Sequence, residues 1–221
     1  MKRLLMFGLL LAVAAFAVGA EVAGSRLHMT PDDTPVIWPA RGHVFYVNSV
    51  TGSATASGLS PALPLTTLKA AIAKCTANRG DIIILQPKHA ETISSAALTP
   101  SVNVAGVTII GMGSGADRPT FTLSHVDATI DITADSTVIR NIVLITGVDS
   151  QKIMLDINAS DAVIEDCEFR EASAKQSLVA IDVNGGKANV CDRTKIRRCR
   201  IIQTADGPNA GIELGEVADE V

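Results

Sequence analysis

One pattern occurs four times between residues 130 and 214: Ile130-Asp131-Ile132, Leu155-Asp156-Ile157, Ile181-Asp182-Val183 and Ile212-Glu213-Leu214. The four copies begin 25, 26 and 31 residues apart. Each alternates an apolar, an acidic and an apolar residue, which is typical of a strand with one face turned to solvent. A repeat of this length carried by short strands indicates a solenoid, in which successive coils of chain stack. The sequence therefore predicts one outward column of carboxylates, formed by Asp131, Asp156, Asp182 and Glu213.

A second pattern keeps the same register. Its copies are Val138-Ile139-Arg140, Val163-Ile164-Glu165 and Lys195-Ile196-Arg197. They follow the acidic pattern by 8, 8 and 14 residues, so the third coil has six extra residues. These fall around Asn184-Gly185-Gly186, which are good turn residues. Asn141 follows the second pattern at an expected sharp bend, because asparagine tolerates the left-handed backbone that such a corner requires.

The composition suits a solenoid interior. Of 221 residues, 47% are hydrophobic but only 3% are aromatic. Small and β-branched side chains stack well between coils, whereas a face that grips sugars by ring stacking is harder to build. The formal net charge of −4 disfavours nucleic acid and anionic membrane surfaces as partners.

Three segments are expected along the chain. Residues 1–20 resemble a secretory signal, with Lys2 and Arg3 before an apolar stretch that is short for a membrane anchor. Residues 21–42 are expected to form an extended arm, and residues 43–221 a β-helix domain. Within that domain we predict a capping helix over about 65–77, from its apolar stripe. No polar cap follows Glu213, so we expect either a truncated chain or an end covered by a partner or symmetry mate.

The residues that carry these patterns resemble right-handed parallel β-helix proteins of the pectate-lyase type. Tyr46-Val47-Asn48, Gly80-Asp81 and Val138-Ile139-Arg140-Asn141 bear this resemblance. His89-Ala90-Glu91-Thr92 and Arg118-Pro119-Thr120 are similar to segments of phage-associated β-helix proteins. The resemblance implies an all-β, right-handed parallel β-helix. It also implies that metal ligands or catalytic acids would lie on the face occupied by the carboxylate column.

The carboxylate column has three interpretations. Asp131, Asp156, Asp182 and Glu213 could form a solvated charged face, bind Ca²⁺, or include an acid or base with a raised pKa. A lyase would also need a base beside the column, for which Lys152 and Lys175 are the candidates. Both are expected in loops just before the first strands of their coils, from which they could reach over the acidic face, and ordinary loop lysines are the favoured alternative. No cofactor-binding motif is found.

Four cysteines follow the leader: Cys75, Cys167, Cys191 and Cys199. Their spacings do not form a zinc site. Cys167 and Cys199 occupy equivalent positions in neighbouring coils, so we expect either a ladder of thiols or a disulfide.

Two function hypotheses follow. The first is a non-catalytic structural protein, exported to the cell surface, periplasm or medium, or carried on a virion, that contacts surface glycans and assembles with virion proteins or as a homotrimer. The second is a Ca²⁺-assisted polysaccharide lyase, or less favourably a glycoside hydrolase, acting on acidic polysaccharide.

Overall fold

The computed structural model describes residues 25–29, 35–39, 42–183, 191–203 and 210–215. The predicted leader at 1–20 lies outside these residues. By its internal contacts the chain divides into two units, 1–40 and 41–221. Among the helices of the described segments, none combines the length and apolar character needed to cross a bilayer.

The first unit contains a hairpin rather than only an extended arm. Strand β1 (Ser25–Met29) pairs antiparallel with β2 (Pro35–Pro39). Prolines occupy the first and last positions of β2, where a missing N–H disturbs the pairing least. The alternation in these five-residue segments was too short to predict strands.

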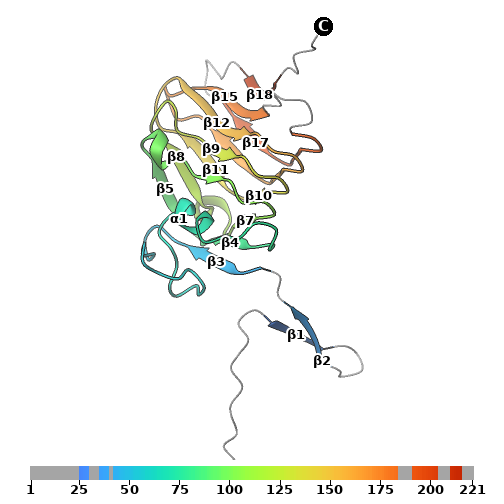
Figure 1. Cartoon of the computed structure of the whole chain (residues 1–221). Coiled ribbons are helices and arrows are strands. Elements are labelled where there is room, and N and C mark those ends of the chain that lie inside the picture. Colours follow the sequence, from blue (N-terminus) through green and yellow to red (C-terminus); the bar gives the residue numbers. More distant parts are fainter. Residues whose placement is uncertain (1–24, 30–34, 40–41, 184–190, 204–209, 216–221) are drawn as a thin grey trace, which may run out of the picture. The chain divides into compact units, whose positions relative to one another are not determined.

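Three parallel sheets build the second unit (Figure 1). Within the described residues, sheet 1 has six strands and sheets 2 and 3 have five each. Sheet 1 comprises β3 (Val44–Val47), β4 (Ile82–Leu85), β7 (Thr108–Gly111), β10 (Val138–Arg140), β13 (Val163–Glu165) and β16 (Lys195–Arg197). Sheet 2 comprises β5 (Ala90–Ile93), β8 (Thr120–Leu123), β11 (Val143–Thr146), β14 (Glu168–Arg170) and β17 (Arg200–Ile202). Sheet 3 comprises β6 (Ser101–Val102), β9 (Ile130–Ile132), β12 (Gln151–Ile157), β15 (Ser177–Val183) and β18 (Ala210–Leu214).

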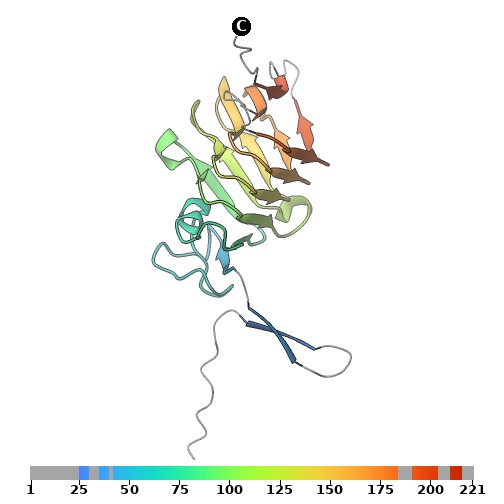
Figure 2. The ribbon, with the colours of Figure 1, turned by 45° about the vertical axis from the view of Figure 1, so that its right-hand side comes forward.

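From β4 onward the chain visits sheets 1, 2 and 3 in turn and returns to sheet 1 one strand further along. Figure 2 shows the resulting coils stacked in sequence order, from cyan to red. This winding confirms the predicted parallel β-solenoid. Two short 3₁₀ helices, η1 (Ala96–Leu98) and η2 (Gly115–Asp117), lie in the connections.

The predicted register is confirmed residue by residue. Leu155 pairs with both Ile130 and Ile181, and Ile181 pairs with Ile212. The side chains of Ile130, Leu155 and Ile181 are fully buried, whereas Ile212 on β18 is 46% exposed. A parallel ladder of isoleucines lines the interior of sheet 1, formed by Ile83, Ile109, Ile139, Ile164 and Ile196. Small and β-branched apolar residues thus fill the interior, as the composition predicts.

Strand β16 keeps its register despite the longer third coil. Val163 pairs with Lys195 and Glu165 with Arg197. The turn predicted around Asn184-Gly185-Gly186 lies outside the described residues. The extra residues therefore leave the pairing of the following strand unchanged.

The sharp bend between sheets 1 and 2 is made by one left-handed residue in each of three successive coils. Its φ is 57° at Asn141, 56° at Asp166 and 52° at Arg198. The prediction for Asn141 is confirmed, and the same geometry extends to two residue types that adopt it less readily. For residues other than glycine this conformation costs on the order of 1 kcal/mol, so the surrounding coils must hold it in place.

The only helix of α type in the described residues is shorter than predicted. Helix α1 spans Leu68–Ile72, with the Thr67 side chain accepting a hydrogen bond from the Ala70 N–H as its N-cap. The predicted boundaries of 65–77 are wrong because Leu65 pairs with β3: its N–H donates to Tyr46 O, and its carbonyl accepts from the Asn48 N–H, both at 2.8 Å. A helix of five residues does not support the predicted capping role.

Candidate functional site: an acidic column and a paired charge cluster

The predicted carboxylate column exists on the outward face of sheet 3. Asp156 pairs in register with Asp131 on one side and with Asp182 on the other, and Asp182 pairs with Glu213. Ser101 extends the same row from β6. The column follows from strand alternation, because the apolar residues that flank Asp131, Asp156 and Asp182 are buried in the core. We call these four acidic residues the acidic column.

The electrostatics of the acidic column differ from those of isolated surface carboxylates. Burial raises the pKa of Asp156; the Asn158 amide, which donates a hydrogen bond of 2.8 Å, opposes the shift, and the charges of Asp131 and Asp182 add to it. The pKa of Asp182 is also raised, by burial and by the charge of Glu213. Proton affinity in the middle of the column is thus higher than usual.

Asp131 has two unequal oxygens. Ser101 Oγ donates to its Oδ2 at 3.1 Å, while its Oδ1 is buried and has no hydrogen-bond partner among the described residues. An unpaired buried acceptor is costly, so a cation at this oxygen would supply a missing contact.

A metal site is not assembled in the described part of the chain. No group of three or more His, Cys, Asp or Glu residues there is arranged to hold an ion. The acidic column is a straight row with one carboxylate per coil, whereas Ca²⁺ takes about six to eight converging oxygens. Ca²⁺ binding by Asp131, Asp156, Asp182 and Glu213 stays a prediction.

Lys152 lies within β12 rather than in the loop before it. Its Nζ is 2.5 Å from Asp127 Oδ1, and the Lys152 ammonium lowers the pKa of Asp127. Asp127 also lies 3.8 Å from His125 Nδ1. Asp156 lies four positions after Lys152 in the strand, about 13 Å along the backbone. The ammonium is therefore held in an ion pair away from the acidic column.

Lys175 lies in the turn between β14 and β15. Its carbonyl accepts a hydrogen bond of 2.6 Å from Thr146 Oγ1, and its side chain is exposed. Among the described contacts, none joins its ammonium to the acidic column. The structure thus places both candidate bases near sheet 3 without bringing either to a carboxylate of the column.

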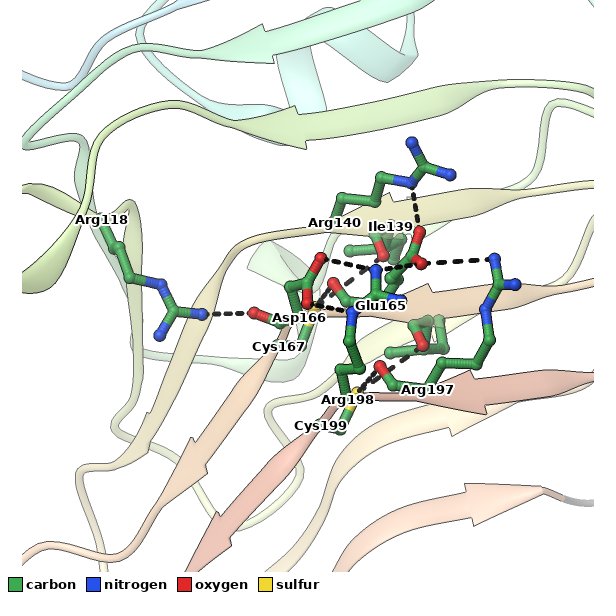
Figure 3. A network of polar contacts seen from close by, with 10 residues as sticks. Arg118, Ile139, Arg140, Glu165, Asp166, Cys167, Arg197, Arg198 and Cys199 are labelled. Atoms are coloured by element: carbon green, nitrogen blue, oxygen red, sulfur yellow. Dashed lines mark hydrogen bonds and ion pairs between the residues drawn. The ribbon is translucent and has the colours of Figure 1, made fainter.

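A second charged region lies on the outward face of sheet 1 (Figure 3). Glu165 of β13 is only 5% exposed and accepts from three guanidiniums. Arg140 Nε lies 2.7 Å from Glu165 Oε2, Arg197 Nη2 lies 3.4 Å from Oε1, and Arg198 Nη2 also binds Oε1. Arg198 additionally binds Asp166, through Nε at 2.8 Å and Nη2 at 3.1 Å. The pKa of Asp166 is lowered, first by this hydrogen bond.

The sequence reasoning missed this cluster, although a signal was present. Arg140, Glu165 and Arg197 occupy the third position of the second pattern and are direct neighbours in β10, β13 and β16. A cation, an anion and a cation in one register position predict mutual pairing across the strands.

Arg118 contacts the equivalent corners of the next two coils. Its Nη2 donates to Asp166 O at 2.6 Å and to Ile142 O at 3.1 Å, and its Nη1 donates to Glu168 Oε2 at 3.3 Å. The other oxygen of Glu168 accepts from Arg170. These bonds join three successive coils and satisfy carbonyls at the left-handed bends.

Cys167 and Cys199 stack at the same corner as free thiols. Hydrogen bonding to Cys199 and burial raise the pKa of Cys167. Each thiol also donates to a backbone carbonyl, at 3.3 Å from Cys167 to Glu165 O and 3.4 Å from Cys199 to Arg197 O. Of the two expected states, this structure has the thiol ladder. Cys75 and Cys191 are free as well.

Comparison with known proteins yields no family model and no curated protein that matches the chain. Among solved structures, a rhamnogalacturonan lyase is similar, with 15% sequence identity and a TM-score of 0.49. The similarity covers 72% of this chain and 51% of that one, so the chain spans about half the length of the lyase structure. The parallel solenoid is established here by the sheets themselves.

Proposed function

We propose that this chain is a non-catalytic structural β-helix protein, exported or carried on a virion, that contacts surface glycans through its outward sheet faces. The proposal rests on how the charged side chains of the outward sheet faces are paired. In the described residues the buried carboxylates of sheets 1 and 2 are held in ion pairs, and the acidic column has no base bound to it. Removal of a proton beside a uronic carboxylate needs a free base within hydrogen-bond reach of the substrate.

Export and virion association are supported by the sequence. The 1–20 segment has the charge and apolar length of a leader, and the phage-like resemblance spans several motifs of the β-helix domain. Assembly as a homotrimer or with virion proteins belongs to the same proposal. Mass spectrometry of protein recovered from the medium would test export, with a mature N-terminus at Glu21 as the expected result.

The second candidate is a Ca²⁺-assisted polysaccharide lyase, or less favourably a glycoside hydrolase, centred on the acidic column. A specific observation favours it: Asp131 Oδ1 is buried without a partner, beside Asp156, whose pKa is raised. A cation bound at this point would supply the missing contact.

One assay separates the two candidates. Absorbance of unsaturated uronic products is followed on a panel of acidic polysaccharides with Ca²⁺, using the wild type, Asp156→Asn and Asp117→Asn. Asp117 is half-exposed and paired with Lys88 away from the acidic column, so its variant loses the same charge elsewhere. We expect no product from any of the three. Product formed by the wild type and by Asp117→Asn, but not by Asp156→Asn, would replace the structural proposal with the lyase.

A further inference from the structure

The outward face of sheet 1 carries more positive than negative charge, in a chain whose formal net charge is −4. Arg140, Arg197 and Arg198 surround Glu165 and Asp166. Three cations thus face two carboxylates, an excess of one positive charge. We call these five residues the basic face.

The guanidiniums of the basic face have donors left over. The side chains of Arg140, Arg197 and Arg198 are 47%, 48% and 61% exposed, whereas that of Glu165 beneath them is 6% exposed. Within the described residues Arg140 and Arg197 are each bound to Glu165 through a single nitrogen. A guanidinium has five N–H donors in a planar fork, so most of those on Arg140 and Arg197 point to solvent.

Glu165 preorganises the cations rather than cancelling them. Its carboxylate fixes three long side chains that would otherwise lose rotamer entropy when a ligand bound. The strands that carry Arg140 and Arg197 lie two coils apart, about 10 Å along the stack, with Glu165 between them. Both guanidiniums reach the Glu165 carboxylate, at 2.7 Å and 3.4 Å, so they form one compact patch. A polymer with repeated anionic groups presents many such groups to this patch, which raises their effective concentration.

We propose that the basic face binds an anionic polysaccharide, whose carboxylate or sulfate groups are taken by Arg140 and Arg197 in paired N–H···O contacts. This inference rests on the proposed function and assigns its glycan contact to one surface and one chemical class. Charge-assisted, two-pronged contacts of this kind are the strong ones that arginine makes.

The observations favour a polysaccharide over a nucleic acid. Single-stranded nucleic acid is held by aromatic stacking as well as by cations. The aromatic residue on the outward face of sheet 1, Tyr46, belongs to β3 at the opposite edge of that sheet from β16.

Binding of the full chain to four probes tests the proposal: polygalacturonate, dextran sulfate, neutral dextran and a single-stranded DNA oligomer. The test variant is Arg140→Gln/Arg197→Gln, and the matched control is Arg170→Gln/Arg193→Gln. The control removes the same charge from side chains that are 47% and 66% exposed and lie outside the basic face. Arg140→Lys/Arg197→Lys retains charge while removing the fork, and serves if the glutamine variant does not fold.

We expect polygalacturonate or dextran sulfate to bind the wild type and neutral dextran not to bind. The dissociation constant should rise about tenfold or more in the test variant and less than about threefold in the control. The rise in the dissociation constant of the lysine variant should lie between these two values. Binding should weaken steeply with added salt, because the contacts are exposed.

Three outcomes would overturn the inference: no binding of either polyanion, equal losses in the test and control variants, or tighter binding of DNA than of both polysaccharides. If the wild type binds and the test and control variants lose affinity equally, the chain still contacts glycans, but through a face other than the basic face. Release of unsaturated product from polygalacturonate would instead overturn the non-catalytic function without touching this surface assignment.

Discussion

The acidic column and the basic face use the same geometry with opposite results. In both, charged residues stand directly above one another, one coil of about 4.8 Å apart. Asp131, Asp156 and Asp182 repeat one sign, whereas Arg140, Glu165 and Arg197 alternate. At this separation two unit charges interact by roughly 3.5 kcal/mol at an effective dielectric of 20 and by about 1 kcal/mol in water. The solenoid sets the distance between charges in neighbouring coils, and the residue type at each position determines whether they repel or attract.

The largest expected effect comes from removing the one anion at the centre of the basic face. Glu165→Gln leaves three guanidiniums around a buried neutral group and should lower the free energy of unfolding by about 3 kcal/mol, as measured by denaturant titration. The control Glu213→Gln, in the exposed last position of the acidic column, should change it little. Equal losses in both variants would mean that the two stacks are energetically alike.

A single substitution should convert the acidic column into an alternating stack. Asp182→Arg places a cation between Asp156 and Glu213 and should raise the free energy of unfolding by about 1 kcal/mol at low salt. Repeating the denaturation at 1 M salt should remove most of the gain, because the pairs are partly exposed. A gain that did not depend on salt would point to packing rather than charge.

The pH dependence of Asp156→Asn should reveal the cost of ionising Asp156, which comes first from burial and then from the charges of Asp131 and Asp182. The pKa of Asp156 is raised in the folded state above its ordinary value of 3.8. Ionisation of Asp156 therefore destabilises the fold as the pH rises from 3.8 to the folded-state pKa, and this loss of stability persists at higher pH. Asn158 can still donate to the new amide oxygen. Thermal melts should therefore favour the variant by about 0.5 kcal/mol at pH 7, with no advantage below pH 3.8. A difference that stayed constant across this range would exclude Asp156 ionisation as its cause.

The smallest effect is expected for an exposed pair at the turn before β16. Arg193→Gln breaks the ion pair with Asp161, in which Arg193 Nη2 lies 2.6 Å from Asp161 Oδ2. Both partners are solvated, so the melting temperature should stay within experimental error of the wild type. A clear loss of stability would show that inter-coil pairs contribute even without burial.

The sequence predicted the parallel solenoid and the acidic column for one physical reason. A period-two alternation repeated at nearly constant intervals specifies both which side chains face outward and which of them stack. Register is therefore readable for Ile130, Leu155 and Ile181 without any knowledge of their tertiary contacts. The left-handed bend at Asn141 was predictable for a similar local reason.

Features set by contacts distant in sequence were not predictable in this way. The apolar stripe of 65–77 indicated a long helix, but the backbone of Leu65 forms hydrogen bonds with Tyr46 and Asn48 instead. Lys152 was a candidate base because it was expected in a loop just before a first strand, whereas its ammonium binds Asp127. The partner of a long charged side chain depends on its reach and on burial, and neither quantity can be read from the spacing of residues in the sequence.

The unchanged register of β16 after a longer third coil has a practical meaning. The connection between β15 and β16 accommodates six more residues than its counterparts, and Val163 still meets Lys195. Chain length at that position is thus uncoupled from the stacking of the coils. A peptide tag inserted there should leave the stacking of the coils unchanged, and the same site would let the protein acquire a new recognition loop without rebuilding its interior.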